Sequence, residues 1–559
     1  MNSNKHSPLW VMPITYPKTF VTPYIDPSKP SVLGLILAIL AYGIYRYVNR
    51  DRRTFPPGPK PLPLVGNIFD FPAPGVPEYQ HWFKHKDQYG GISSVTALGT
   101  TLVFVHDRTI ARDILERMSI KTSGRPVMQF AGELCGYGTW PLFQGYTSLF
   151  RQYRKLFHQS IGTKALVSQL RDVQELEVHR QLVRCLRRPE DWSHHLKTTA
   201  SATTLKVTYG YTVEPEGDDV LVEHIDKMMQ EFTLAAVPST WAVDLIPALR
   251  YLPEWFPGAS FKKTARVWRK HVEDTVNMPY QFARRQMAAD CHHQSYVSRM
   301  VGEFEASKGN DGAGLSPEDE QAIILTAASF YAAGADTTVI TLTSFIAAMV
   351  LFPEVQRKAQ EEIDRVVGTD RLPTFDDREG LPYINAVVKE ALRWWTVLPL
   401  CLIHVADQDF EYNGYCIPKG AYILPSLWWA LNDPEVYTSP EKFDPERFLS
   451  PRNEPDPAIH QFGYGRRICA GRFLADASVY LSIVKTLAVF NINKPVDKDG
   501  KEVDIEVKPT AGILNYLQKF NVRITPRSPK HEDLVKQLEA GNLWEKGDSE
   551  AIKRMKNDH

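Results

Sequence analysis

A long apolar segment in the middle of the chain limits the possible folds more than any other feature of the sequence. It begins after Ser316 to Glu320 (SPEDE), where serine can cap a helix, proline suits the first helical position and acidic side chains complement the helix dipole. The apolar pattern continues to about Leu351, and Pro353 ends it. A helix of this length is unusual in a globular protein, so the sequence predicts a domain built mainly of helices.

The rest of the body also has helical patterns, with smaller amounts of strand. Further helices are predicted over residues 148–160, 353–368 and 382–395, and after Cys469. Strands are predicted as a hairpin over 90–106 and as short pieces over 400–425 and 503–525. Residues 432–465 contain frequent Pro, Asp and Gly and are predicted to form a long meandering loop. We therefore expect a single, mainly α domain with small β-sheets over residues 67–525.

The charge balance and the cysteines exclude several classes of protein. Lysine and arginine together number 65, as do aspartate and glutamate, so the formal net charge is zero and nothing points to nucleic acid as a partner. The six cysteines are scattered without a CxxC pair, and a chain of 559 residues does not need disulfides to fold. A reducing compartment is therefore expected for the folded part.

An apolar run near the N-terminus predicts a membrane anchor. Residues 32–48 (VLGLILAILAYGIYRYV) are nearly uncharged, and as a helix they suit a bilayer slightly thinner than average. Arg50, Arg52 and Arg53 follow, so the positive-inside rule places the rest of the chain in the cytoplasm. The alternative for residues 32–48 is a buried core helix.

The chain is thus expected to have five parts. They are a tail over 1–31, the anchor over 32–48, a basic and proline-rich linker over 49–66, the main domain over 67–525, and a tail over 526–559. The last tail is highly charged, which predicts a peripheral or disordered segment.

The sequence FGYGRRICAG at residues 462–471 has the properties of a loop that presents one thiolate to a metal. Such a ligand must be deprotonated, and positive charge lowers the pKa of a thiol. Arg466 and Arg467 lie close to Cys469 in sequence, and amide donors at the start of the following helix are expected to add to their effect. Gly465 and Gly471 let the backbone turn tightly and approach a flat cofactor.

This loop resembles the haem-binding signature of the cytochrome P-450 family, Phe-x-x-Gly-x-Arg-x-Cys-x-Gly. The five fixed positions are occupied by Phe462, Gly465, Arg467, Cys469 and Gly471. The resemblance implies haem b (iron protoporphyrin IX) as cofactor, with the thiolate of Cys469 as the axial iron ligand, whose electron donation favours O–O cleavage.

Two other interpretations of this cysteine are open. One is a buried, inert cysteine beside a surface loop. The other is a zinc site, but the spacings of its candidate ligands fit no common structural zinc pattern. Those candidates are Cys401, His404, Cys416, His460 and Cys469.

The run AGADTT at residues 333–338 lies in the middle of the long predicted helix. Its small residues would leave room for a bound diatomic molecule, and a local break in helix bonding would open a groove. An acid beside an alcohol can relay protons. The run resembles a motif of the same family, which implies that Thr337 hydrogen-bonds bound dioxygen and that Asp336 links it to solvent. The alternative is a face of small residues that serves helix packing alone.

Other segments resemble the family's scaffold and its haem contacts. Glu390 and Arg393 lie on one helix face, and together with Arg447 in the sequence PERF (445–448) the resemblance implies a buried cluster that locks the cysteine loop. Arg154 in FRQYRK (150–155) and His404 are implied to contact haem propionates. The alternatives are a surface ion pair for Glu390 and Arg393 and a solvated side chain for His404. Phe150 departs from the family's usual tryptophan.

The resemblance covers about residues 56–525 and looks closest to fungal secondary-metabolism members, the O-methylsterigmatocystin oxidoreductase-like group. It implies an oxidoreductase that inserts one oxygen atom from O2 into a hydrophobic small molecule, such as a terpenoid or polyketide intermediate, and releases the other as water. The substrate pocket is expected to be lined by residues from the following places: 125–145, 232–256, Phe330, Tyr331, 397–400 and 512–514. Competing interpretations are a haem-thiolate isomerase or dehydratase and a non-catalytic haem-binding sensor.

The implied partners follow from what the chain lacks. No flavin or nicotinamide fingerprint occurs in it, so electrons are expected from NADPH through a separate NADPH–cytochrome P-450 reductase. Arg151, Lys155 and Arg466 are candidates to steer that partner's acidic surface, or they form an ordinary solvated face. The expected location is the endoplasmic reticulum membrane, with a single span and a cytoplasmic catalytic domain.

Overall fold

The computed structural model describes residues 54–559 except Pro74, Ser239, 308–314, Asn542 and 558–559, and before them only Gly34 and Ala41. The predicted anchor over 32–48 therefore lies outside the described residues apart from those two positions. Residues 54–61 and 65–559 form one compact unit. Within the described residues one helix, α13 (Pro317–Leu351), is long and apolar enough to cross a membrane, but most of its apolar stretch is buried in the protein, as expected of a core helix.

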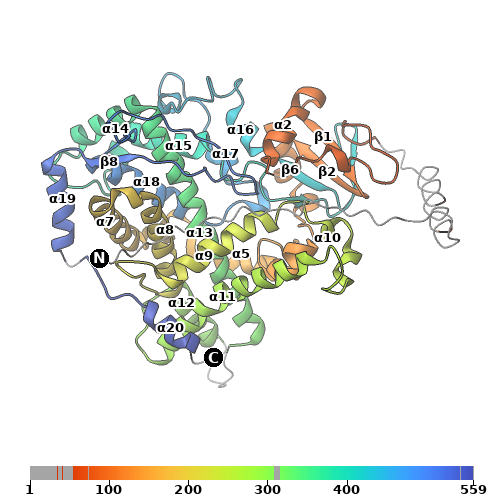
Figure 1. The fold of residues 1–559 in the computed structure, drawn as a ribbon, viewed down its shortest axis with the longest axis horizontal. Coiled ribbons are helices and arrows are strands. Elements are labelled where there is room, and N and C mark those ends of the chain that lie inside the picture. The colour runs from red at the N-terminus through yellow and green to blue at the C-terminus, as the bar shows by residue number, and fades with distance from the viewer. Residues whose placement is uncertain are drawn as a thin grey trace, which may run out of the picture. The chain divides into compact units, whose positions relative to one another are not determined.

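The predicted long helix is confirmed as α13, and it forms the centre of the helical part (Figure 1). The hydroxyl oxygen of Ser316 accepts a hydrogen bond from the Asp319 backbone N–H, so the expected serine cap is present. Helices packed against α13 include α5 (Ser148–Ile161), α8 (Trp192–Tyr209), α9 (Val220–Ala235), α11 (Ser260–Ala288), α12 (Tyr296–Ser307), α15 (Pro382–Trp394) and α18 (Arg472–Val489).

Helix α8 packs unusually closely on α13 because its inner face is made of small residues. Its threonines are buried, and several bond back to their own helix: Thr203 donates to the Thr199 carbonyl and Thr204 to the Ala200 carbonyl. These bonds satisfy the hydroxyls of Thr203 and Thr204 locally, whereas the hydroxyls of Thr199 and Thr208 are buried without a partner among the described residues. A Cβ at Gly334 of α13 would lie 2.4 Å from Thr204 Cγ2, so only glycine allows this approach.

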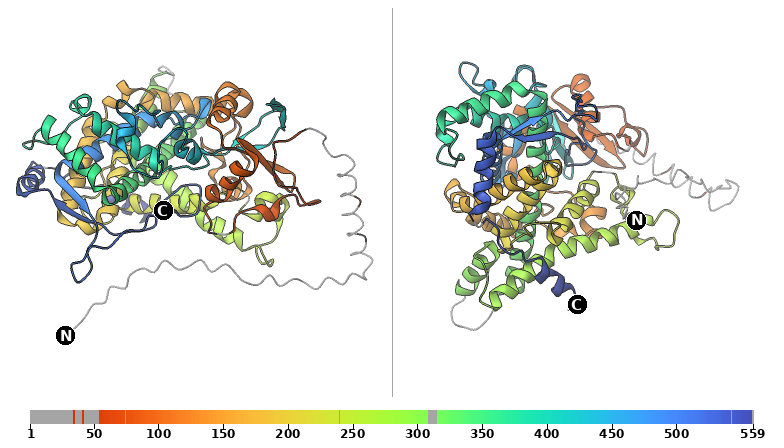
Figure 2. Two further views of the ribbon diagram at one scale, coloured as in Figure 1. Left: turned by 90° about the horizontal axis from the view of Figure 1, so that it is seen from above. Right: turned by 60° about the vertical axis from the view of Figure 1, so that its left-hand side comes forward.

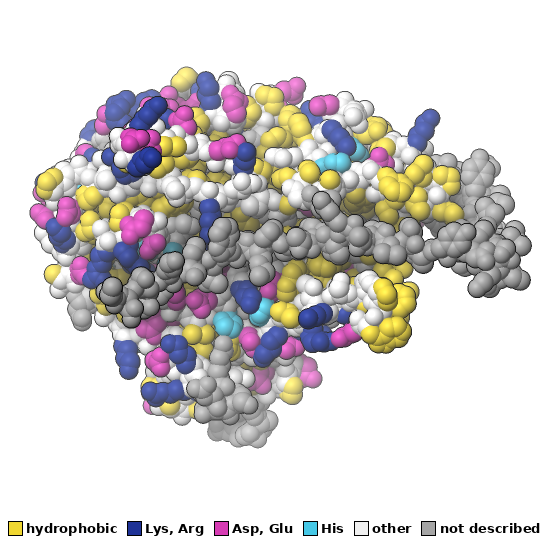
Figure 3. Space-filling view, in the orientation of Figure 1, with side chains coloured by type: hydrophobic (Ala, Val, Ile, Leu, Met, Phe, Trp, Pro, Cys, Tyr) yellow, Lys and Arg dark blue, Asp and Glu magenta, His cyan; other side chains and the backbone are white. Residues whose placement is uncertain are grey.

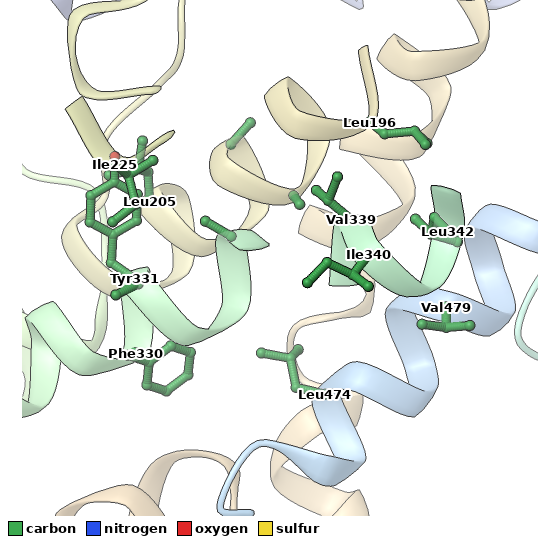
Figure 4. Close-up of a cluster of buried hydrophobic side chains, with 14 of the residues drawn as sticks. Leu196, Leu205, Ile225, Phe330, Tyr331, Val339, Ile340, Leu342, Leu474 and Val479 are labelled. Atoms are coloured by element: carbon green, nitrogen blue, oxygen red, sulfur yellow. The ribbon is translucent and has the colours of Figure 1, made fainter. Parts of the chain in front are cut away.

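Large apolar side chains fill the space on either side of this contact (Figure 4). Tyr331 points toward α8 and α9 and donates a hydrogen bond to the Leu221 carbonyl oxygen, 2.5 Å away. Phe330 points the opposite way, toward Leu474 of α18. The expectation that Tyr331 lines a substrate pocket is therefore wrong, because its ring belongs to the core between these helices.

The predicted hairpin is confirmed as β1 (Ile92–Ala97) and β2 (Thr100–Val105), joined through Leu98 and Gly99, both with positive φ. It continues into a four-stranded sheet in the order β1-β2-β6-β3, in which β2 and β6 (Tyr422–Pro425) run parallel. Strand β3 is His404–Val405. Figure 1 shows α2 (Glu78–Tyr89) beside this sheet.

Two smaller sheets complete the strands. They are β4 (Phe410–Tyr412) with β5 (Tyr415–Ile417), and β7 (Phe490–Asn493) with β8 (Arg523–Pro526). Of the short strands predicted over 503–525, β8 and an isolated bridge between Pro509 and Leu517 are present. The remaining α-helices in the domain are α3 (Arg108–Arg112), α4 (Ser119–Thr122), α6 (Lys164–Ser168), α7 (Arg171–Arg187), α10 (Ala242–Leu245), α14 (Pro353–Val366), α16 (Leu427–Asn432) and α17 (Ala458–Gln461).

The charged C-terminal segment is folded, which corrects the expectation of a peripheral or disordered tail. It forms α19 (Pro529–Ala540) and α20 (Ser549–Asn557), and Figure 2 shows α19 alongside α7. Val535, Leu543 and Ile552 are buried. A few apolar side chains at the right spacing are enough to dock a segment whose composition is mostly polar.

Acidic and basic side chains are intermixed over the face shown in Figure 3. This agrees with the zero net charge of the sequence.

The helices and strands described above confirm the predicted mainly α architecture with small β-sheets.

Candidate active site

The cysteine loop is closed by its own backbone. The Cys469 N–H donates to the Phe462 carbonyl oxygen at 2.8 Å, directly before α18 begins at Arg472. Gly465 has φ of +53°, and a Cβ there would lie 2.3 Å from the Leu115 carbonyl oxygen. The expected need for glycine is confirmed at this position.

At Gly471 only the predicted tight turn is wrong, and the close approach to a flat cofactor stays a prediction. The Gly471 φ of −87° is open to any residue, so no tight turn requires glycine here. A Cβ at Gly471 would lie 4.0 Å from the sulfur of Cys469 and 3.8 Å from Ile161 Cδ1. The absence of a side chain keeps the approach to the sulfur clear.

Cys469 is exposed as a residue, so a ligand can approach it, although the protein around its sulfur excludes much of the water there. Burial against the surrounding protein raises its pKa, and the amides of Gly471 and Arg472 and the charge of Arg154 act in the opposite direction. The amide donors at the helix start are as predicted. Arg466 and Arg467 donate their hydrogen bonds to Tyr146 and to the Ser123 carbonyl, so neither is bonded to the sulfur, and their help through charge stays a prediction. A bound metal is what converts such a thiol to thiolate.

Arg154 on α5 fixes the loop from the side. Its Nη1 donates to the Ile468 carbonyl oxygen at 2.8 Å, one residue before the cysteine. Burial lowers the pKa of Arg154, as expected of a guanidinium group taken out of water. The helix itself follows from its sequence, since Thr147 caps α5 by accepting from the Phe150 N–H.

Arg467 is held by carbonyl oxygens and by an aromatic ring. It donates to the carbonyl of Ser123 at 2.9 and 2.5 Å and to that of Gln144 at 2.6 Å. Its guanidinium carbon lies 3.6 Å from the centre of the Phe150 ring, so Phe150, which departs from the family pattern, serves as a cation–π platform. Burial, together with the nearby charges of Arg125 and Arg154, lowers the pKa of Arg467 to about 8.

Arg125 joins this group and was not identified as a site residue from sequence. It donates to the carbonyls of Leu402 at 3.0 Å and Ile403 at 2.5 Å, and burial lowers its pKa to about 10. A lone arginine in an irregular segment carries no sequence signal of this role. Its neighbours in space come from a segment almost 280 residues away along the chain.

His404 lies in the same region, at the start of β3. It is buried, its Nδ1 lies 2.8 Å from the Thr122 carbonyl oxygen, and burial and the charge of Arg125 lower its pKa. With a proton on Nδ1, the neutral ring leaves Nε2 as an acceptor. His404 can therefore donate to an anion from Nε2 only in its protonated form.

These cations lack acidic partners. Among the described residues, none of Arg125, Arg154 and Arg467 forms an ion pair with a carboxylate, although the charge of Asp407 reaches Arg467. Even partly buried guanidinium groups without counter-charges carry a desolvation cost. A ligand with two carboxylates beside an accessible thiol would supply what is missing, and haem with its two propionates has this chemistry.

The run at 333–338 is part of an uninterrupted helix, so the predicted local break in α13 is wrong. The hydroxyl of Thr337 donates to the Ala333 carbonyl oxygen at 2.7 Å, so it is satisfied within its own helix. Gly334 faces α8, where it serves packing, as described above. The packing interpretation therefore holds for Gly334, while Ala333 and Thr337 keep some exposure.

Asp336 is buried, with 5% of its surface exposed. It accepts a hydrogen bond from the Tyr516 hydroxyl, and burial raises its pKa to about 6 despite that bond. A carboxyl with such a pKa can exchange protons near neutral pH. Tyr516 lies 180 residues away along the chain, and nothing in its local sequence indicates this contact.

Glu390, Arg393 and Arg447 come together as expected and are completely buried. Arg393 donates to both oxygens of Glu390 at 2.8 Å, and Arg447 Nε donates to Glu390 Oε1 at 3.0 Å. Arg393 also holds the carbonyls of Leu431 and Pro440, both at 2.8 Å. The surface-pair alternative is excluded by this burial. The cluster fixes the long loop that leads to the cysteine.

The zinc alternative finds no support. No group of three or more His, Cys, Asp or Glu side chains in the described part of the chain is placed to hold a metal ion. Cys416 is buried in β5 and Cys401 lies in a turn with positive φ. A single cysteine with an external cofactor is therefore the metal chemistry that these residues fit.

Comparison with known proteins agrees with the site. A family profile for cytochrome P-450 matches residues 56–521. The multifunctional cytochrome P-450 monooxygenase af510 of Aspergillus fumigatus is 47% identical over 518 residues, which cover 92% of this chain and 96% of that protein.

Two other fungal proteins show similar coverage. The cytochrome P-450 monooxygenase CLM2 of Gibberella zeae is 45% identical over 94% of this chain and 99% of its own length. The O-methylsterigmatocystin oxidoreductase of Aspergillus flavus is 37% identical over 90% of this chain and 94% of its own length. The match over most of the chain, with the motifs in place, leads to one conclusion: the chain belongs to the cytochrome P-450 family of haem-dependent monooxygenases.

Proposed function

We propose that Cys469 is the axial sulfur ligand of haem b and that Arg125, Arg154 and Arg467 hold its propionates. The observation that supports this most directly is the gathering of these partly buried cations, which have no ion-pair partner among the described residues, beside the exposed Cys469. His404 joins them as a donor when a propionate keeps it protonated. When bound, the haem supplies reductive activation of O2 and transfer of one oxygen atom to the substrate.

The first experiment tests the ligand. Full-length wild-type protein, reduced in the presence of carbon monoxide, should give the difference spectrum of thiolate-ligated haem. Cys469→Ser should abolish that spectrum, because an alkoxide or alcohol does not replace the electron donation of a thiolate. Cys401→Ser is a matched control that removes another cysteine of the same domain and should retain the spectrum. An unchanged spectrum in Cys469→Ser would exclude the proposed ligand.

Asp336 and Thr337 are proposed to pass protons to the reacting oxygen. The buried carboxyl with a pKa of about 6 supports a role for Asp336 in proton exchange, and the hydroxyl of Thr337 can accept and donate in turn. Asp336→Asn should lower coupled product formation on the order of a hundredfold, with hydrogen peroxide released instead. Thr337→Ala should uncouple in the same way. Unchanged coupling in both variants would favour a haem-thiolate enzyme that does not activate O2.

The redox partner is proposed to be a membrane-bound NADPH–cytochrome P-450 reductase. Arg151 and Arg466 are exposed and share one aromatic neighbour, the ring of Tyr146, at 5.7 and 4.9 Å, and Lys155 is exposed on the same helix as Arg151. Such a basic surface next to the cysteine loop favours an acidic partner. The rate with reductase should fall as salt rises, and a charge reversal at Arg151 should weaken that dependence.

The substrate is proposed to be a hydrophobic terpenoid or polyketide intermediate, and the location the endoplasmic reticulum membrane. One relative's printed name refers to a methylated sterigmatocystin, and Phe330 is a large apolar side chain that points away from the α8–α9 core. Incubation of the full-length protein and reductase with a panel of sesquiterpenes and polyketides, including O-methylsterigmatocystin, tests the class. Turnover confined to highly polar compounds would contradict it, and product without O2 would contradict monooxygenation.

A further inference from the structure

Two neighbouring spaces lie between α8 and α9, behind the acid of α13. The outer space has a volume of about 170 Å³ and is lined by charged residues that include His194 and Glu223. The inner space has a volume of about 10 Å³ and reaches Ala335 and Asp336, which is room for roughly one water molecule. The two spaces share three lining residues, Lys197, Val222 and Asp226.

An ion pair stands where the two spaces meet. Lys197 Nζ on α8 lies 2.6 Å from Asp226 Oδ1 on α9, and each side chain is 34% exposed. Gln230 holds the other oxygen of Asp226 at 3.0 Å. Because both ions line the outer and the inner space, they contact solvent on one side and approach the buried acid on the other.

Asp336 is the group at the inner end. Its one hydrogen-bond donor among the described residues is the hydroxyl of Tyr516. The charges of Lys197 and Asp226 both reach Asp336, with opposite signs. The carboxyl is therefore isolated from acids and bases other than this pair and the phenol.

Tyr516 belongs to a segment, residues 513–516, that is hydrogen-bonded to neighbouring helices at several points. The N–H groups of Ile513 and Leu514 bond to the carbonyl and hydroxyl of Thr233 on α9, at 3.2 and 3.0 Å. The segment is also bonded to the residue that follows α15, since the Trp395 indole donates to the Asn515 carbonyl at 2.6 Å. A donor on a rigid support holds the Asp336 carboxyl in one orientation, with its remaining lone pairs free for the inner space.

We infer that protons reach Asp336 from solvent between α8 and α9, through the inner space, with Lys197 and Asp226 as positioning residues and Tyr516 holding the acceptor. This inference rests on the proposed role of Asp336 in the monooxygenase reaction. That reaction converts substrate RH, O2, NADPH and H⁺ to ROH, H2O and NADP⁺, so two electrons and two protons enter the site in each turnover. In its proposed role Asp336 would give up a proton to the reaction and regain one from the inner space, which the outer space refills.

The first test removes the amine from the path. Lys197→Met should lower the fraction of NADPH electrons recovered in product by roughly tenfold, with a matching rise in hydrogen peroxide and a larger solvent deuterium isotope effect. Lys206→Met is the matched control. Lys206 lies on the same helix and also pairs with an acid, Glu545, at 3.0 Å, but it lines neither space, so coupling should not change.

A second variant fills the inner space without altering charge. Val222 is 5% exposed and lines both spaces, so Val222→Phe should block the path and uncouple turnover. Iodosylbenzene gives a readout that fold damage would not mimic. It transfers an oxygen atom without external protons or electrons, so both variants should retain wild-type product formation with it while they lose it with O2 and NADPH.

The outcomes separate this inference from the function on which it rests. If Asp336→Asn uncouples turnover but Lys197→Met and Val222→Phe remain fully coupled, protons arrive by another route and the inference is overturned. If Asp336→Asn itself remains coupled, the proposed role of the acid fails. Loss of activity with iodosylbenzene as well as with O2 would show damage to the haem site and would likewise count against a proton path.

Discussion

Two groups of buried charges in this protein differ in how completely they are paired. The frame cluster consists of Glu390, Arg393, Arg447 and Glu454, and every oxygen of Glu390 accepts a hydrogen bond. Arg447 Nη1 also donates to Glu454 Oε2 at 2.7 Å. This cluster fixes the loop before Cys469.

The tail cluster is only partly paired. It consists of Glu177, Arg180 and Arg184 on α7 with Trp544 from the C-terminal segment. Arg180 donates to Glu177 Oε1 at 2.7 Å, but Glu177 Oε2, Arg180 Nη2, Arg184 Nη1 and the Trp544 indole nitrogen are buried without a partner in the described part of the chain. The guanidinium carbons of Arg180 and Arg184 lie 5.8 and 5.1 Å from the Trp544 ring.

The difference shows that buried charge stabilises a fold only where each donor and acceptor is satisfied. A complete network loses most when one member is removed, because its partners are then left buried and unpaired. An incomplete network already carries that cost. Glu390 at the centre of the frame cluster should therefore be intolerant of substitution and Glu177 of the tail cluster tolerant, although both are buried and both pair with arginine.

The largest expected effect is at the centre of the frame cluster. Glu390→Gln removes the charge that faces Arg393 and Arg447 and should lower the free energy of unfolding by about 3–5 kcal/mol. Little full-length protein should then retain the carbon monoxide spectrum. The matched change Glu177→Gln should cost about 1 kcal/mol or less. Urea midpoints, followed by circular dichroism, give the loss of stability in each purified variant. Equal losses in Glu390→Gln and Glu177→Gln would contradict the expected difference between the two clusters.

The sequence predicted one of these clusters and missed the other for a physical reason. The resemblance to the family implied the contact of Glu390, Arg393 and Arg447, because these residues stand in short motifs that the family shares, whereas their spacing alone is equally compatible with a surface ion pair. The tail cluster joins α7 to a segment more than 350 residues later. Composition alone predicted that segment to be peripheral, because its polar residues outnumber the few apolar ones that dock it.

The same distinction holds at the active site. The cysteine loop could be predicted because all its requirements lie within ten residues, and α13 because its caps and apolar pattern are local. Arg125 and Tyr516 could not be predicted, because their roles arise from packing between distant segments. The predicted break in α13 failed for a related reason: Gly334 is needed for the contact with Thr204 of α8, which no local pattern reveals.

A smaller effect is expected where the C-terminal segment docks. Trp544→Ala removes a half-buried ring that covers three arginines, including Arg187 at 6.0 Å, and should lower the free energy of unfolding by about 2 kcal/mol. Trp255→Ala is the control, since Trp255 is 81% exposed and its loss should have an effect within about 0.5 kcal/mol. Equal effects in the two variants would show that the C-terminal segment does not contribute to stability.

The smallest effect uses pH to tell the two clusters apart. Burial alone would raise the pKa of Glu454, but hydrogen bonds from Arg447 and Arg452 outweigh it and hold the pKa below the usual 4.5. A carboxyl with a lowered pKa adds stability above 4.5, and this contribution is lost as the pH falls through the folded-state pKa. Glu454→Gln should therefore cost about 1 kcal/mol near pH 7, and the gap to wild type should close in acid.

Glu177 should respond in the opposite direction. Burial raises its pKa above 4.5 in spite of Arg180 and Arg184, so its contribution is present in acid and is lost as the pH rises through the folded-state pKa. The stability of Glu177→Gln relative to wild type should thus rise as the pH is raised. The relative stability of Glu454→Gln should fall over the same range. Glu446→Gln is the control, because that side chain is 51% exposed and should show neither trend. Urea midpoints between about pH 4 and pH 8 decide the matter; parallel curves for the two buried variants would mean that pairing does not distinguish the clusters.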